Sequence, residues 1–341
     1  MILSLVLVLA IPVAATEYTA PTVPGTVEGL MPAETESFGE DLWKVVKSAI
    51  SQLRPDVTAA AGVCLSLCAV VMLTSILNSF PGSSQRVTGF ACVLALSTVL
   101  MGKTNSMIGL GRETVGELTD YGKLLMPAMT GALAAQGGVN SAAALYAGTM
   151  VFTTVLSTLI QKLLVPMIYM YLVLSVAQSA TGEDILKKIR DLMKWLMTWG
   201  LKIILYVFTG YMSITGVISG TADATALKAT KLTISGMVPV VGGILSDASE
   251  AVVLGAGVMK NAAGVYGMVA VLAICISPFL QIGVQYLILK LTAALCGAFG
   301  VKQASGLVED FSGAMGLLLG MTGTVCVMLL VSVVCFMRGM G

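Results

Sequence analysis

The chain has 341 residues, of which 57% are hydrophobic and only 11% are charged, and its formal net charge is +1. A soluble domain carries about 25% charged residues, so this composition predicts an integral membrane protein in contact with membrane lipid. The small net charge argues against a nucleic-acid partner, because phosphate binding needs a concentrated basic face. The absence of histidine excludes Ser-His and Cys-His nucleophiles, HExxH zinc sites and histidine proton relays. We therefore expect an all-α, polytopic membrane protein without catalytic residues, metal or cofactor.

The first 55 residues combine an apolar start with a polar segment. Residues 1–15 end in Val13 and Ala15, the small-x-small pattern of a cleaved signal peptide. An uncleaved anchor is the alternative, and the missing basic n-region leaves open a start further upstream. Residues 16–55 are predicted to be an extracytoplasmic segment that ends in an amphipathic helix, with Trp43 at headgroup level. Packing against the rest of the protein explains the apolar stripe of this helix equally well: Leu42, Trp43, Val46, Ala49, Ile50 and Leu53.

Residues 56–110 predict a transmembrane hairpin. Val57–Phe80 is long and apolar enough to cross a bilayer, and Val87–Met101 returns after a Pro-Gly turn. A polar interval, Lys103–Lys123, comes next. It carries several ionisable residues, among them Arg112, Glu113, Glu117 and Asp120. We expect this interval to be solvated surface, and the alternative is that its two glutamates act as paired acids on one helical face.

A proline pattern occurs twice in the second part of the chain. Pro127–Gly131 and Pro239–Gly243 both read P-x-x-x-G, and a second proline follows each at the same spacing, at Pro166 and Pro278. Both second prolines open similar apolar runs. This predicts an internal repeat of proline-broken helices, of the kind that membrane transporters commonly carry. The two units would be residues 121–220 and 233–338.

The stretch Ser235–Gly264 is apolar but too rich in glycine and proline for an ordinary spanning helix. In lipid, such backbone persists only where protein or a water-filled cavity satisfies it. It is either a tight helical hairpin packed on small residues or a pair of broken helices lining a path through the membrane. Asp247 and Glu250 have the spacing of a helix N-cap pair, or form an ion relay with Lys260 as the countercharge. The candidate broken-helix or conduit residues are Pro127, Gly131, Pro166, Pro239, Gly242, Gly243, Asp247, Glu250, Lys260 and Pro278.

The densest basic cluster of the chain lies between these units, at Lys187, Lys188, Arg190 and Lys194. The positive-inside tendency places such a cluster in the cytoplasm. It is a topology signal, or alternatively a docking face for a cytoplasmic partner. Counting the apolar segments to the final span, Leu317–Met337, gives about eight or nine transmembrane helices after the signal peptide.

Three features together resemble a known family: the run SGMVPVVGGILSDASEAVVLGAGVMKNAAGVYG from Ser235, the upstream LMPAMTGALAAQGG, and a leader before a Trp-bearing amphipathic segment. They are similar to the stage III sporulation protein AE family of endospore-forming bacteria, over nearly the whole chain. The resemblance implies a multi-pass protein of the mother-cell membrane facing the forespore. It also implies a secretion-like channel shared with other stage III sporulation proteins and a forespore-side partner, and no catalytic residues carry over.

Two functions follow for testing. The first is a non-enzymatic channel subunit needed for sporulation, with the broken helices at Pro127 and Pro239 packed at its centre and never bare to acyl chains. The alternative is a secondary transporter, or permease, of a small solute that uses Asp247, Glu250 and Lys260 as coupling groups. Neutralising those charges should abolish a transporter but matter little in a scaffold. An intramembrane enzyme has little support, since neither a histidine nor a GxGD motif is present.

Overall fold

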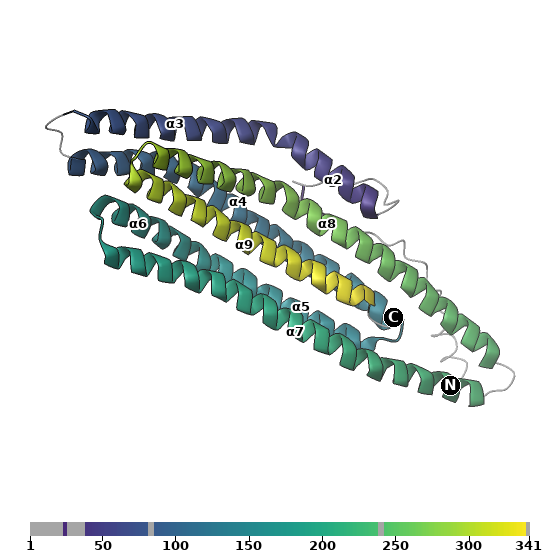
Figure 1. Ribbon diagram of the computed structural model, residues 1–341. Helices are drawn as coiled ribbons and strands as arrows, with labels where there is room; N and C mark the ends of the chain where they lie inside the picture. The colour runs from purple at the N-terminus through teal and green to yellow at the C-terminus, as the bar shows by residue number, and fades with distance from the viewer. Residues whose placement is uncertain (1–22, 26–37, 81–84, 238–241, 339–341) are drawn as a thin grey trace.

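The structure, a computed structural model, describes residues 23–25, 38–80, 85–237 and 242–338, and it places side chains outside 38–41, 85 and 216–261. Within these residues every regular element is a helix, so the all-α prediction is confirmed (Figure 1). The elements are α2 (Phe38–Gln52), α3 (Arg54–Asn78), α4 (Gln85–Ala135), α5 (Val139–Leu159), the π-helix η1 (Ile160–Leu164), α6 (Val165–Thr181), α7 (Asp184–Met237), α8 (Gly242–Ala298) and α9 (Lys302–Arg338).

Six rods in the described part of the chain are long and apolar enough to cross a membrane. They are Arg54–Asn78, Arg86–Ala135, Val139–Thr181, Asp184–Thr215, Ala262–Ala298 and Lys302–Arg338. A multi-pass membrane protein is therefore supported, whereas the count of eight or nine spans is not confirmed. Residues 1–15, the expected signal peptide, lie outside the described residues.

The rods run side by side, and three of the connections lie at one end of the bundle (Figure 1). These are the α3–α4, α6–α7 and α8–α9 connections. Gly182 and Gly300 end α6 and α8 there, both with a φ of 78°. That left-handed conformation closes a helix C-terminus at low cost only for glycine. We call this end of the bundle the hairpin end. Helix α2, the α4–α5 turn and the end of α9 lie at the opposite end.

The polar interval predicted at Lys103–Lys123 is not a connecting segment, because it forms the middle of α4. The predicted short proline helix near Pro127 is likewise the last part of the same 51-residue helix. The reason is that the polar residues of this interval lie on one side of the helix. Its inner side carries apolar residues at helical spacing, and these are buried: Met107, Ile108, Val115 and Leu118. The hairpin and repeat boundaries predicted at residues 110 and 121 therefore fall inside one helix.

Pro166 also lies within a continuous rod. It stands in the first turn of α6, where a missing amide N–H costs least. The π-turn η1 precedes it, and the amide of Val165 donates to the carbonyl of Ile160 across that wider turn. A π-turn of this kind absorbs the irregularity that proline introduces. The chain from Val139 to Thr181 consequently crosses the bundle as one rod.

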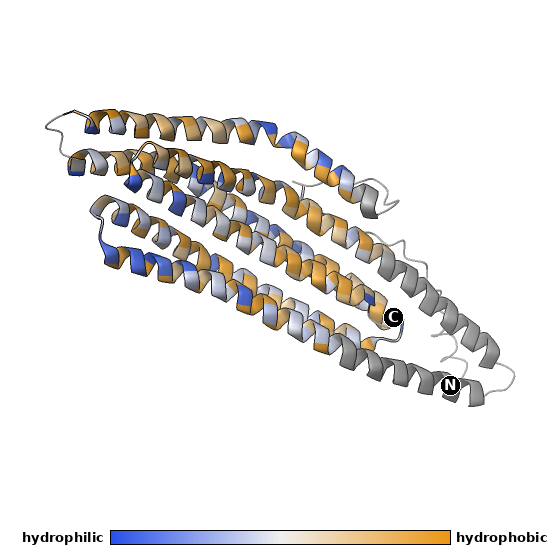
Figure 2. Cartoon of the chain, in the orientation of Figure 1, coloured by the Kyte–Doolittle hydropathy of each residue, from blue (hydrophilic) through white to orange (hydrophobic). Residues whose placement is uncertain are grey.

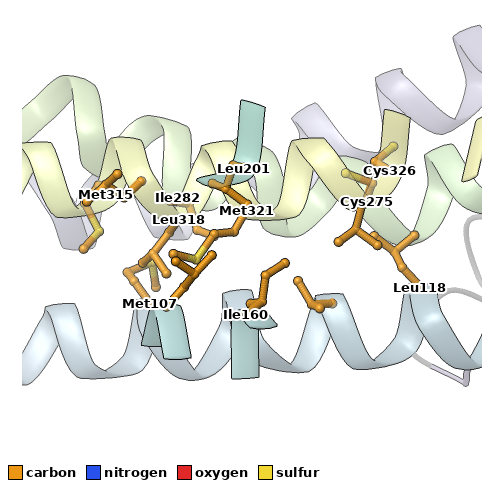
Figure 3. Close-up of a cluster of buried hydrophobic side chains, with 14 of the residues drawn as sticks. Met107, Leu118, Ile160, Leu201, Cys275, Ile282, Met315, Leu318, Met321 and Cys326 are labelled. Carbon is orange, nitrogen blue, oxygen red and sulfur yellow. The ribbon is translucent and has the colours of Figure 1, made fainter. Parts of the chain in front are cut away.

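The buried core lies between α4, α8 and α9, with α7 closing one side (Figure 3). Met107 of α4 faces Ile282 of α8 and Leu318 of α9, and Cys275 lies against Cys326 further along. Small residues let these helices approach closely: a methyl group on Gly122 would come 2.8 Å from Leu329, and one on Gly267 2.6 Å from Leu125. Such close approach is typical of helix packing in membranes.

Helix α2 uses one side of its apolar stripe for packing inside the protein. Val45, Ala49 and Leu53 are buried, and α2 contacts α8 and α3. Trp43 is 68% exposed on the other side, and Ile50 is exposed as well. Packing against the protein thus accounts for part of this stripe, while the exposed tryptophan stays available for the membrane surface.

Candidate functional site: a polar face on a spanning helix

The residues proposed for ion or proton coupling fall where the structure gives no side chains. Pro239 lies outside the described residues, and Gly242, Gly243, Asp247, Glu250 and Lys260 belong to the part of α8 without described side chains. Their role in a conduit or a transporter therefore stays a prediction.

The remaining candidate prolines are less buried than expected. Pro127 and Gly131 are exposed on the outer side of α4, and Pro166 is exposed at the start of α6. Only Pro278, inside α8, is partly buried. Within the single chain no described helix covers Pro127. The expectation that the broken helices at Pro127 and Pro239 are enclosed by protein therefore stays a prediction about the assembled channel.

The four residues of the basic cluster differ in burial. Lys187, Lys188 and Lys194 are exposed at the start of α7, near the hairpin end, where polar residues collect (Figure 2). Arg190 is buried instead and pairs with Asp310 of α9. Arg190 therefore does not contribute to an exposed docking face, and the face predicted for a cytoplasmic partner reduces to the three lysines.

The Arg190–Asp310 pair joins three helices. The side chains of Arg190 and Asp310 are only 10% and 12% exposed. The guanidinium also donates to Gln178 of α6 at 3.3 Å and to the neighbouring Asp191 at 2.9 Å. The hydroxyl of Tyr171, also from α6, donates to Asp310 at 3.4 Å. A charge pair with these additional partners fixes α6, α7 and α9 relative to one another.

A cleft of about 1130 Å³ opens at the hairpin end. Its walls come from the end of α3, the start of α4, the end of α6 and the α8–α9 turn, and they include Asn78, Arg86 and Lys302. The cleft lies close to the exposed lysines in the fold, because all of these segments meet at that end of the bundle.

The outer side of α4 is the most unusual surface of the described bundle. At 3.6 residues per turn, one side of the helix collects polar and small residues, nearly all of them exposed. We call this the α4 polar face: Gly102, Asn105, Ser106, Gly109, Arg112, Glu113, Gly116, Asp120, Lys123, Pro127 and Gly131. Leu124 is an exposed apolar residue at its edge, and Glu117 is partly buried at the same edge. Asp120 and Lys123 form an ion pair at 2.8 Å on this face.

This face lies at the depth of the most apolar segments. A methyl group on Gly111 would come 3.5 Å from Leu318 and 3.7 Å from Ile282, and Gly122 lies against Leu329. The charged part of the α4 polar face is therefore level with the middle of α9. At that depth the other helices expose mainly apolar side chains, such as Val151 and Val155 on α5, Ile203 and Val207 on α7, and Val327 on α9. Lys202 of α7 and Thr154 of α5 are exposed there too, but as single polar residues and not as a continuous face.

A polar groove borders the face. It has a volume of about 230 Å³ and lies between α4 and the α5–η1 rod. Every lining residue other than Gly116 is polar: Thr119, Asp120, Lys123, Thr154, Ser157, Thr158 and Gln161. Tyr169 adds a further polar contact between these helices, since its hydroxyl donates to Asn105 at 2.6 Å. The polar surface therefore extends from α4 onto the neighbouring rod.

The sequence shows the charges of this segment, whereas the face that they share appears only in the helix. Gly102, Gly109 and Gly116 recur every seven residues, and Arg112, Glu113, Asp120 and Lys123 all fall near that line on a helical projection. The apolar residues on the opposite side repeat with the same period. A helical projection of residues 102–131 would have revealed both sides.

The fold defines a multi-pass, all-helical membrane protein with six candidate spans in its described part. The chain belongs to the stage III sporulation protein AE family, whose family model matches residues 28–339. It is 24% identical over 270 residues to the stage III sporulation protein AE of Bacillus subtilis (strain 168), a match that covers 78% of this chain and 67% of that protein. No solved structure matches the chain. The family resemblance inferred from the sequence is thereby confirmed.

Proposed function

We propose that this protein is a membrane-embedded, non-enzymatic subunit of a secretion-like channel between the mother cell and the forespore, and that it is needed for sporulation. The observation that carries the proposal is the α4 polar face at the depth of the apolar spans. Membership of the sporulation family supplies the cellular context. The partners would be other stage III sporulation proteins of the mother-cell membrane and a forespore-side protein.

The energetic argument begins with the four charges on the face, Arg112, Glu113, Asp120 and Lys123. A charged side chain at the centre of a bilayer costs about 2.5–3.5 kcal/mol on insertion scales. Four such residues facing acyl chains would cost about as much as the whole marginal stability of a folded domain, even though Asp120 and Lys123 are paired with each other. The face must therefore meet protein or water inside the membrane. A subunit of a larger membrane assembly satisfies this requirement.

The orientation of the protein in the membrane follows from the number of rods that precede the basic cluster. Three described rods, α3, α4 and the α5–α6 rod, precede the Lys187–Lys194 cluster. If the segment before α3 is extracytoplasmic, three crossings put the cluster in the cytoplasm, in agreement with the positive-inside tendency. The hairpin end would then face the mother-cell cytoplasm, with its cleft and exposed lysines available there.

The test uses sporulating cells in which the only copy of the protein is tagged. We expect the protein to collect in the mother-cell membrane around the forespore, and a small reporter made in the mother cell to enter the forespore only when the protein is present. The control is a strain that carries the tag alone. An even distribution over the mother-cell membrane, or reporter passage that does not depend on the protein, would contradict the proposal.

A further inference from the structure

We propose that the α4 polar face packs against the same face of a second copy of this chain, inserted in the membrane in the same orientation. The inference deepens the proposed function and rests on it in one respect, namely that protein covers this face. It states which protein covers the α4 polar face, which neither the fold nor the family membership does.

The first observation is the contrast between two sets of glycines. Gly122, Gly148 and Gly267 each lie directly against a side chain of another helix. Gly102, Gly109 and Gly116 would allow an equally close helix contact, yet a methyl group on any of them would meet nothing within 4 Å. The chain therefore uses small residues for close helix contact on the inside and presents a similar row, without a neighbour, on the outside.

The second observation is independent and concerns charge. At 3.6 residues per turn, Arg112 falls on one side of the glycine row, whereas Glu113 and Asp120 fall on the other, and Lys123 continues the row seven residues after Gly116. The four charges sum to zero, and each depth contains both signs. A surface with one basic edge and one acidic edge is complementary to a copy of itself.

Membrane insertion restricts how the copies can meet. Copies with the same orientation are related by a rotation axis along the membrane normal, so equivalent residues lie at equal depth. In such a parallel pairing the basic edge of one helix faces the acidic edge of the next, as the flanking positions do in parallel coiled coils. Arg112 then reaches Glu113 of the second copy. Lys123, which lies on the row itself, pairs with Asp120 of its own chain and in the pairing comes within reach of Asp120 of the second copy as well. The seven-residue repeat of the glycines matches the left-handed crossing of this packing.

A different membrane protein would need its own basic and acidic edges at the same two depths to replace this contact. Water alone would satisfy the charges but would not require a glycine at every second turn. The combination of a glycine row and two edges of opposite charge is therefore best matched by a second copy.

The first experiment is cysteine cross-linking of the full chain in the membranes of sporulating cells. Gly109→Cys should form a cross-link between copies with a short bis-maleimide. Gly210→Cys is the matched control, because Gly210 is exposed on α7 and also has open space above it. The parent chain, with its seven natural cysteines, sets the background.

The second experiment exchanges charges. An acidic chain carries Arg112→Glu and Lys123→Glu, and a basic chain carries Glu113→Lys and Asp120→Lys. Each should lose the Gly109→Cys cross-link when expressed alone, and co-expression of the two should restore it between differently tagged copies. This restoration keeps the test valid even if one charge variant accumulates poorly by itself.

Three outcomes would overturn the inference. They are a membrane-inserted Gly109→Cys chain without a cross-link between copies, a cross-link that joins this position to another stage III protein instead, and labelling by a water-soluble maleimide without cross-linking. Each leaves the proposed function standing, because forespore localisation and reporter passage are measured separately. Conversely, the copies could cross-link while the reporter also enters the forespore in cells that lack the protein. That pair of results would retain the contact between copies and refute the channel role.

Discussion

Removing one partner of the buried Arg190–Asp310 pair gives a sharp test of the packing at the hairpin end. In Arg190→Met, the carboxylate of Asp310, only 12% exposed, loses its charged partner. Breaking a buried pair in this way costs about 3–5 kcal/mol, because the remaining charge stays desolvated. The hydroxyl of Tyr171, at 3.4 Å, is too long a contact to replace the guanidinium. We therefore expect a loss near the upper part of that range.

The nearby Lys290–Glu309 pair supplies the matched control. It has a good distance, 2.8 Å, but both side chains are more than half exposed. Exposed pairs contribute about 0–1 kcal/mol, so Glu309→Gln should change the free energy of unfolding little. The double variant Arg190→Met with Asp310→Leu should recover most of the loss, since apolar replacement of a whole buried pair is often neutral.

The assay is unfolding of the purified full chain in mixed micelles by increasing SDS, followed by circular dichroism. The four chains are the parent, Arg190→Met, Glu309→Gln and the double variant. The reasoning is refuted if Arg190→Met and Glu309→Gln shift the midpoint equally, or if the double variant is as unstable as Arg190→Met.

Two further predictions use the same assay. A methyl group on Gly148 would collide with the ring of Tyr211, whose hydroxyl donates to the carbonyl of Ala144 at 3.1 Å; Gly148→Ala should cost about 1–3 kcal/mol, as overpacking does. The control Gly210→Ala, with nothing within 4 Å, should be neutral or slightly stabilising. Gly300 has a φ of 78°, so Gly300→Ala should cost about 1–2 kcal/mol through left-handed strain, and Gly300→Asn less. Equal midpoints for Gly148→Ala and Gly210→Ala, or for Gly300→Ala and the parent, would contradict these two statements.

The spanning character of most rods follows directly from composition and local hydropathy. Residues 54–78 and 302–338 each contain an apolar stretch long enough to cross a bilayer. These signals are local, and a sequence reading therefore recovers them.

The polar middle of α4 was misread because its polarity was averaged over all residues instead of being resolved by face. Met107 and Leu118 are buried, whereas Arg112 and Lys123, in the same stretch, are exposed. The Arg190–Asp310 pair was beyond reach for another reason. Its partners are 120 residues apart in sequence, and the sequence of a basic cluster is the same whether its arginine is buried or exposed.

The exposed prolines add an argument about what must cover the bundle. Pro127 has no amide N–H, so it cannot donate to the carbonyl of Lys123, one turn earlier. Pro127 lies on the α4 polar face, and this carbonyl therefore adds an acceptor beside the Asp120–Lys123 pair. In hydrocarbon an unsatisfied backbone group costs several kcal/mol. The same backbone that breaks the hydrogen-bond ladder therefore requires protein or water at the place where the charges already require it. The missing amide of Pro127, the charges and the glycine row thus lead to one physical condition, an outer face of α4 that never meets acyl chains.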